Sequence, residues 1–255
     1  QCHFYVVLNW RKQYAGILKS KYNGITYYFV DNEFYFGGAS PYNNIYEDVE
    51  KFAFFDKAVL MALQYVEFCP DVIHCNDWQT GLLPVFLHTC FGSDTFYANM
   101  KTIFSIHNMK VQGRWRILEV MDSTGLPEHI FNASELESYG EANYLKGGCV
   151  YADCITTVSP TYAHDITTPE GGEGLNGLMY ARRESLFGIL NGIDYKEYDP
   201  ARDPYIWHNF DAQTVTEVKK LNKKKLQQEA GLSVDEDVFL IGIVSRMTDQ
   251  KGFDL

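Results

Sequence analysis

The sequence predicts an α/β protein built on a doubly wound parallel sheet. Three apolar segments lie far apart in the chain, and each runs into a polar turn; they occupy residues 70–78, 101–108 and 238–252. Continuous apolar runs of this kind are typical of strands that are buried on both faces of a parallel sheet. Successive expected strands are roughly 30 to 50 residues apart with helical segments between them, as in doubly wound folds.

The expected elements follow from the spacing of apolar and turn residues. Residues 2–8 and 24–31 are expected to be strands, which could pair as a hairpin. Apolar residues at helical spacing predict a helix over 48–68, with Asp48 as its candidate N-cap. Pro84 lies inside the next expected helix and should kink or shorten it. The remaining expected strands are 71–76, 102–107, 154–159, 186–191 and the apolar start of 238–252, and the remaining helices lie near 136–151 and 214–230.

A change in composition after Asn191 predicts a domain boundary. Residues 194–204 are rich in turn residues, and a lysine-rich helix precedes the last expected strand. The boundary is expected near 191–195. Residues 1–192 would then form one α/β domain, and residues 193–255 would form a linker and the beginning of a second.

Composition excludes several classes of protein. The 255 residues are 46% hydrophobic and 22% charged, as in an ordinary globular protein. The formal net charge of −11 argues against a nucleic-acid partner, which needs a basic face. No apolar run approaches the ~18 residues of a membrane span. Six cysteines without Cys-x-x-Cys spacing favour a reduced, cytoplasmic compartment. Because the chain lacks an initiator Met and stops after a strand and turn, we expect an internal fragment of a longer protein.

Three other motifs are better explained without a special function. Residues 172–177 spell Gly-x-Gly-x-x-Gly, but no expected strand precedes them, so a loop that opens a helix is favoured over a dinucleotide site. The lysines between 219 and 225 have the spacing of a solvated helix face. His74, Asp77 and His107 do not form a metal-ligand pattern, so no metal is expected.

Polar side chains at the ends of the expected strands predict a binding site. Asp77 and Trp78 follow one strand, and His107 and Asn108 follow another. In open α/β sheets ligands bind at the carboxyl ends of strands. A carboxylate, an indole face, an imidazole and an amide together suit a sugar, which presents hydroxyls and apolar C–H faces.

Two cations follow the last expected strand. Arg246 and Lys251 flank a turn there. A pair of cations beside a helix N-terminus is suited to a diphosphate, because charge-assisted hydrogen bonds and the helix dipole both favour an anion.

Six segments, in order along the chain, resemble bacterial glycogen synthases and plant starch synthases. They are HCNDWQTGLLP (74–84), IHNMKVQG (106–113), NYLKGGCVYAD (143–153), TTVSPTYA (156–163), GILNGID (188–194) and SRMTDQKG (245–252). The resemblance implies two Rossmann-like domains that face a deep cleft. It also implies transfer of glucose from ADP-glucose to the non-reducing end of an α-1,4-glucan such as glycogen, with retention of configuration and without a cofactor.

The resemblance also implies roles for individual residues. Asp77 and His107 would be catalytic. Arg246 and Lys251 would hold the nucleotide diphosphate. The residues expected to bind the transferred glucose or the acceptor are Tyr42, Trp78, Asn108 and Asn191. The family's N-terminal Lys-x-Gly-Gly-Leu loop and its C-terminal segment with a catalytic-site Glu are not among the 255 residues, so the chain alone is expected to be inactive.

Three alternatives stay open at this point. The chain could act only as a glucan-binding module, which retardation on a glycogen gel would reveal. The parent could use UDP-glucose, because the residues that recognise the base lie beyond Leu255. A related phosphorylase would need a pyridoxal-phosphate lysine, which absorbance would detect.

Overall fold

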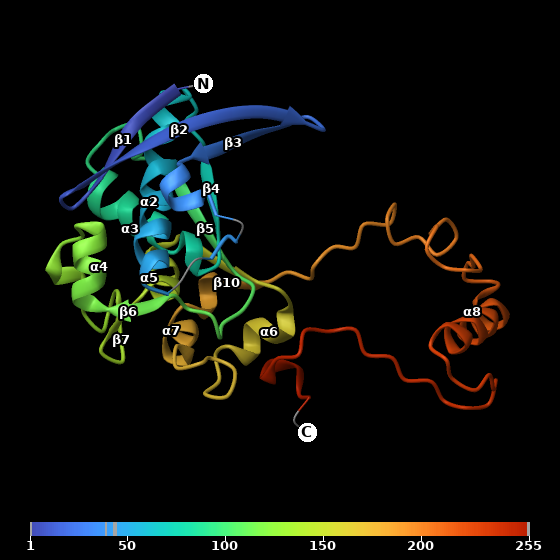
Figure 1. Cartoon of the computed structure of the whole chain (residues 1–255). Coiled ribbons are helices and arrows are strands. Elements are labelled where there is room, and N and C mark those ends of the chain that lie inside the picture. Colours follow the sequence, from blue (N-terminus) through green and yellow to red (C-terminus); the bar gives the residue numbers. More distant parts are fainter. Residues whose placement is uncertain (1, 39, 43–44, 254–255) are drawn as a thin grey trace. The chain divides into compact units, whose positions relative to one another are not determined.

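The computed structural model describes residues 2–38, 40–42 and 45–253. Contacts within the chain divide it into two units, residues 1–191 and 192–255. The first unit holds three β-sheets and most of the helices, and the second holds one long helix with irregular chain on either side (Figure 1). Each unit is described by itself.

A four-stranded parallel sheet forms the centre of the first unit and confirms the predicted α/β class. Its strands lie in the order β10-β9-β5-β4, so each strand is the neighbour of the one that follows it in this sheet. The strands are β4 (Val72–Asn76), β5 (Lys101–Ile106), β9 (Cys154–Thr157) and β10 (Leu186–Gly188).

Burial within this sheet differs from the expectation for its first strand. On β5, Phe104 and Ile106 are fully buried, as predicted for a central strand. On β4, the side chains of Val72, His74 and Asn76 are exposed. The prediction that β4 is buried on both faces is therefore wrong, because β4 lies at the edge of the sheet in the part of the chain that the structure describes.

The N-terminal residues form an antiparallel sheet with one more strand than expected. β1 (Cys2–Leu8) and β3 (Ile25–Asp31) match the two predicted strands, but both pair with an unpredicted central strand, β2 (Arg11–Tyr22), and not with each other. Phe4, Val6 and Ile17 are buried on the inner face of this sheet, which covers one end of the long helix α2 (Figure 1). A third, small antiparallel sheet contains β6 (Arg114–Arg116), β7 (Glu137–Ser138) and β8 (Glu141–Asn143).

The helices correct several further expectations. The long helix α2 spans Ile45–Tyr65, so Asp48 lies inside its first turn and is not the N-cap. There the carboxylate still interacts favourably with the helix dipole. The expected helix near 136–151 is only half helical, because β7 and β8 precede α5 (Tyr144–Tyr151). The other helices of eight or more residues in the described chain are α4 (Ile117–Thr124) and α8 (Val215–Glu229), and the short ones are α1 (Glu33–Phe36), α3 (Leu82–Phe86), α6 (Pro160–Asp165) and α7 (Asn176–Ala181).

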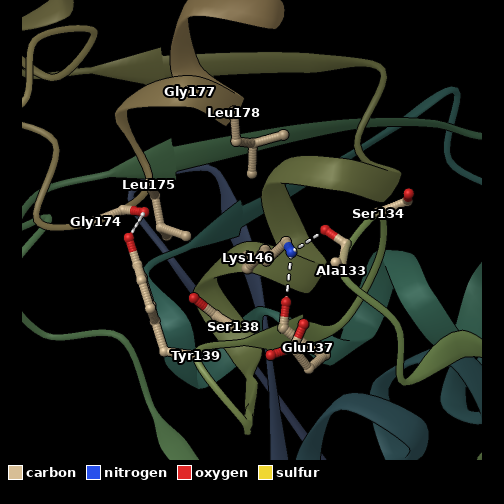
Figure 2. Close-up of a pocket in the computed structure, with 10 residues that line it drawn as sticks. All are labelled: Ala133, Ser134, Glu137, Ser138, Tyr139, Lys146, Gly174, Leu175, Gly177 and Leu178. Carbon is tan, nitrogen blue, oxygen red and sulfur yellow. Dashed lines mark hydrogen bonds between the residues drawn. The ribbon is translucent and has the colours of Figure 1, made fainter.

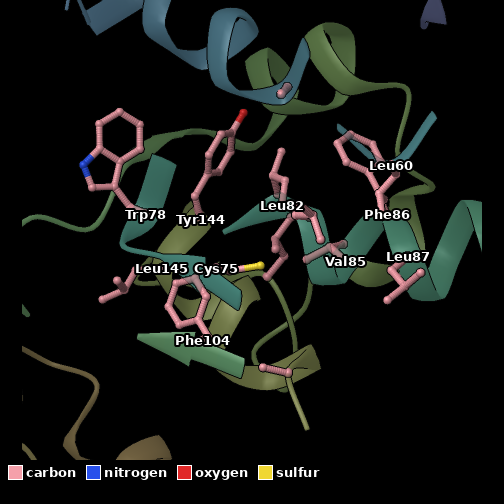
Figure 3. Packing of buried hydrophobic residues seen from close by; sticks show 14 of the residues in the cluster. Leu60, Cys75, Trp78, Leu82, Val85, Phe86, Leu87, Phe104, Tyr144 and Leu145 are labelled. Carbon is pink, nitrogen blue, oxygen red and sulfur yellow. The ribbon is translucent and has the colours of Figure 1, made fainter. Parts of the chain in front are cut away.

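Pro84 does not interrupt the helical path after β4. It is the third residue of α3, where a backbone N–H would have no partner inside the helix. The path begins with the 3₁₀ turn η1 (Trp78–Thr80) and continues after α3 as a π-helical turn, η2 (Leu87–Phe91). These segments pack their apolar side chains against α2, α5 and β5, where Leu82, Phe86 and Phe104 are fully buried (Figure 3).

The last apolar segment, at the start of 238–252, does not form the predicted strand. Phe239, Ile241 and Val244 are exposed, and no strand pairs with this segment within the described residues. A strand needs a partner for its backbone hydrogen bonds, and apolar residues alone do not supply one.

A buried carboxyl group links α2 to the start of α3. Oδ2 of Asp56 accepts a hydrogen bond from the N–H of Leu82 at 2.9 Å. Asp56 is fully buried, and its Oδ1 has no hydrogen-bond partner. Burial raises the pKa of Asp56 well above its usual range, although the N–H groups of Leu82 and Leu83 act in the opposite direction. The folded protein therefore favours the neutral acid at this position.

We expect Asp56→Asn to remove a pH-dependent loss of stability. Folding raises the pKa of Asp56. The stability that the neutral acid contributes to the folded protein is therefore fully present below the unfolded pKa of ~4, and it is lost as the pH rises through the folded pKa. Asparagine matches the neutral acid in shape and keeps the acceptor for Leu82. In that window, the difference in unfolding free energy between wild type and variant should change by about 1.4 kcal/mol per pH unit, in favour of the variant as pH rises. Urea denaturation at several pH values measures it, and parallel curves would contradict the assignment.

Candidate functional site

The carboxyl ends of β4 and β5 bring Asp77 and His107 together. Oδ1 of Asp77 accepts a hydrogen bond from the backbone N–H of His107 at 2.8 Å, and the N–H of Asp77 donates to the carbonyl of Ser105 at 2.9 Å. This contact follows from the parallel pairing of β4 with β5, in which Asn76 lies opposite Ser105. The two residues predicted to be catalytic are therefore direct neighbours.

Asp77 has an unusual backbone conformation. Its φ is 57° and its ψ is −178°, a region that residues with a Cβ rarely adopt. Conformations of this kind cost of order 1–3 kcal/mol and persist only where surrounding contacts fix them. Here the contacts are the hydrogen bonds to Ser105 and His107, and the N–H of Thr80 also donates to the carbonyl of Asp77 at 3.1 Å. The strained residue directs its carboxylate towards the end of β5.

The imidazole of His107 contacts the residue before Asp77. Its Nε2 lies 3.0 Å from Oδ1 of Asn76, while the ring is otherwise exposed. The sequence pattern does not predict Asn76, Gln79 or Thr80 as site residues. Their proximity to Asp77 in the sequence suggests that they could belong to the site. Only the structure shows the directions in which their side chains point.

Trp78 lies in the core rather than on the surface. Only 7% of its surface is exposed, and its ring packs edge-on against Phe52 at a centroid distance of 4.8 Å and against Trp115 at 5.5 Å. Tyr42 stacks on it at 6.4 Å and is itself half exposed. The hydroxyl of Tyr42 accepts a hydrogen bond from Nε2 of Gln79 at 2.7 Å. Tyr42 is therefore the aromatic side chain of this cluster that reaches solvent, with Trp78 as its support.

Side-chain hydrogen bonds hold the loop that begins at Asn108. Asn108 is half-buried, and its Oδ1 accepts a hydrogen bond from the N–H of Lys110 at 3.0 Å. Nε2 of Gln112 donates to the carbonyls of Met109 and Glu173, each at 3.0 Å. The loop after β5 is thereby joined to the glycine-rich segment 171–177. No strand precedes that segment in the structure, and it leads into α7.

The remaining predicted site residues lie beyond the sheet. Asn191 is exposed and is the last residue of the first unit, three residues after β10 ends. Arg246 and Lys251 belong to the second unit, where both side chains are exposed. The turn between them is closed by a hydrogen bond from the N–H of Thr248 to the carbonyl of Arg246 at 3.0 Å. Lys251 ends a single 3₁₀ turn, η5 (Asp249–Lys251), which begins between the two cations.

A separate cavity of about 370 Å³ lies beside the glycine-rich segment (Figure 2). Nζ of Lys146 donates to the carbonyls of Ala133 at 2.6 Å and Glu137 at 2.5 Å. The hydroxyl of Tyr139 donates to the carbonyl of Gly174 at 3.2 Å on another wall. Burial lowers the pKa of Lys146, and Glu137 acts in the opposite direction. Because carbonyl oxygens satisfy its ammonium group, Lys146 joins β7 to the preceding loop and acts as a structural cation.

Neither a metal-ligand cluster nor a membrane-spanning helix occurs among the described residues. No group of three or more His, Cys, Asp or Glu side chains there is arranged to hold a metal ion. None of the helices in the same residues has the length and apolar character needed to cross a membrane.

Known proteins are similar to this chain over nearly its whole length. Residues 1–181 match the family described as the starch synthase catalytic domain. The chain is 59% identical over 253 residues to the glycogen synthase of Lachnoclostridium phytofermentans, covering 99% of this chain and 53% of that protein. It is 46% identical over 252 residues to the glycogen synthase of Clostridium perfringens, covering 99% and 52%. The chain thus spans about half the length of the curated relatives it matches.

A solved structure shares the fold. The catalytic domain of starch synthase IV from Arabidopsis thaliana, bound to ADP and acarbose, matches with a TM-score of 0.78 and 28% sequence identity. The match covers 91% of this chain and 48% of that one. The α/β architecture described above is therefore similar to that of a starch synthase catalytic domain.

Proposed function

Because the chain belongs to the starch synthase catalytic domain family, we propose that it forms part of a retaining glucosyltransferase. The enzyme moves glucose from ADP-glucose to the non-reducing end of an α-1,4-glucan such as glycogen. The observation that carries the proposal is the family match over residues 1–181, which include Asp77 and His107. In this proposal residues 1–192 are the acceptor-side domain, residues 193–255 begin the nucleotide-binding domain, and the enzyme is cytoplasmic.

The proposed chemistry exchanges one bond at the anomeric carbon for another. The bond from that carbon to the diphosphate oxygen breaks, and the acceptor hydroxyl attacks on the same face. The leaving phosphate oxygen takes the proton of that hydroxyl, so no enzyme nucleophile is needed. Charge builds up on the leaving diphosphate, and Arg246 and Lys251 stabilise it electrostatically.

The first unit holds the sugar in this proposal. His107 forms a hydrogen bond with the transferred glucose, and Asp77 orients hydroxyl groups. The supporting observation is the 2.8 Å hydrogen bond from the backbone N–H of His107 to Oδ1 of Asp77 at the carboxyl ends of β4 and β5, where ligands of α/β proteins bind. Tyr42, which stacks on the buried Trp78, supplies an aromatic face for the sugar, while Asn108 and Asn191 supply amide hydrogen bonds.

A chimera tests the proposed function. The 255 residues are fused to the part of the Lachnoclostridium phytofermentans glycogen synthase that they do not match. We expect this chimera to incorporate labelled glucose from ADP-glucose into glycogen, and to do so faster than from UDP-glucose. No incorporation from either donor, with a folded chimera that is retained on a glycogen gel, would instead favour a glucan-binding module.

A further inference from the structure

Asn76, the last residue of β4, and Asp77, which follows it, both contact His107, the residue that follows β5. Asp77 binds the backbone N–H of His107, and Oδ1 of Asn76 lies 3.0 Å from Nε2 of the same residue. An amide oxygen can accept a hydrogen bond but cannot donate one, so the ring nitrogen that faces it carries the proton. We propose that Asn76 is a positioning residue, which holds the imidazole of His107 as the Nε2–H tautomer and in one rotamer.

The backbone of Asn76 is itself fixed, which gives its side chain a defined direction. The hydroxyl of Thr80 accepts a hydrogen bond from the N–H of Asn76 at 2.7 Å and donates to its carbonyl at 2.9 Å. The carbonyl of Ser105 accepts from the N–H of Asp77 at 2.9 Å and so ties the next residue to β5. The side-chain amide of Asn76 is therefore attached to a backbone that hydrogen bonds hold in place.

Among the residues that the structure describes, Asn76 is the neighbour whose side chain can select one tautomer of this ring. The ring of His107 is exposed, and without the amide its two nitrogens would meet water in either tautomer. One ordinary hydrogen bond changes such a ratio about fivefold. The backbone contact with Asp77 fixes the position of His107 but does not distinguish the two ring nitrogens. The tautomer therefore depends on Asn76.

The tautomer decides what the ring can do. With the proton on Nε2, the other nitrogen, Nδ1, is an acceptor, so His107 can receive a hydrogen bond from a hydroxyl group of a ligand at that atom. This consequence for the sugar rests on the proposed function. The tautomer itself does not, and it can be measured in the chain without substrate.

Nitrogen NMR of the 255-residue chain tests the proposal. Histidine labelled with ¹⁵N is observed at alkaline pH, where imidazoles are neutral, and His107→Gln assigns the signals of His107. We expect protonated Nε2 in the wild type. Asn76→Leu removes the acceptor at similar size and should shift the tautomer ratio about fivefold towards Nδ1–H. Asn76→Asp keeps an acceptor oxygen and should keep the Nε2–H form, and the exposed His129 is the internal control.

Several outcomes would overturn the proposal. A wild-type His107 with its proton on Nδ1 would do so, and so would an unchanged ratio in a folded Asn76→Leu chain. If Asn76→Leu does not fold, the tautomers of His107 measured in the wild type and in Asn76→Asp test the proposal. In the chimera, Asn76→Leu should lower kcat/KM for ADP-glucose about fivefold. A shifted tautomer with unchanged kcat/KM would remove Asn76 from catalysis, whereas an inactive wild-type chimera would reject the proposed function and leave the tautomer assignment intact.

Discussion

Lys251→Ala in the chimeric enzyme is expected to lower turnover with ADP-glucose by about 100- to 1000-fold. Removing one preorganised group that stabilises charge in the transition state typically has an effect of this size. The negative charge on the diphosphate grows as its bond to glucose breaks, so the contact with Lys251 is worth more in the transition state than in the bound substrate. We therefore expect kcat to fall more than KM rises, as measured by steady-state kinetics.

A second lysine of the same unit provides the matched control. Lys225 lies on α8 and is exposed, so Lys225→Ala changes the net charge equally without removing a group assigned to the diphosphate. It should leave kcat within about twofold, because isolated surface charges contribute little. Equal losses in the two variants would indicate a general effect of charge and would reject the role of Lys251. Near wild-type turnover for Lys251→Ala would reject it as well.

The parallel sheet could be predicted because its sequence signal is local. β5 and β9 are short apolar runs that end in polar turns, and the expected strands 102–107 and 154–159 start within one residue of the observed ones. Parallel pairing then places the ends of β4 and β5 side by side. The sequence therefore predicts that Asp77 and His107, thirty residues apart, lie in one site, and in the structure they form a hydrogen bond of 2.8 Å.

The antiparallel strands were harder to predict, because much of their sequence does not alternate between buried apolar and exposed polar residues. In β2, Ala15, Gly16 and Ile17 lie towards the core, but from Leu18 to Tyr22 the side chains are exposed on both faces. The usual alternation of apolar and polar residues is therefore missing. β7 and β8 contain two and three residues, too few for any period, and the helical spacing of the following residues extended the predicted helix over them.

The details of the site could not be predicted, because they depend on side-chain direction. The φ of 57° at Asp77 is uncommon for a residue with a Cβ, and nothing in the string Asn-Asp-Trp-Gln-Thr requires it. The burial of Trp78 depends on Phe52 and Trp115, which come from distant parts of the chain. A tryptophan beside a strand end suggests a sugar platform in sequence, but here Tyr42 is the ring that reaches solvent.

The site also depends on a close contact between the turn that contains η1 and the helix α5. Gly81 directly follows η1, and its Cα faces the backbone of Tyr144 at the start of α5. A Cβ added to Gly81 would lie 2.6 Å from the carbonyl carbon of Tyr144 and closer still to its oxygen. These atoms belong to the backbone and cannot turn aside as a flexible side chain would. The two segments can approach this closely only because residue 81 has no side chain.

We therefore expect Gly81→Ala to destabilise the protein by about 3 kcal/mol, at the upper end of over-packing effects. Its φ of −69° suits alanine, so the effect is steric and not conformational. Gly177→Ala is the matched control, because a Cβ there meets nothing within 4 Å and alanine favours the helix α7 by about 0.5–1 kcal/mol. Urea denaturation followed by the fluorescence of buried Trp78 and Trp115 measures both variants. Equal midpoints for Gly81→Ala and wild type would mean that η1 and α5 are not packed as described, and that the position of Asp77 depends on other contacts.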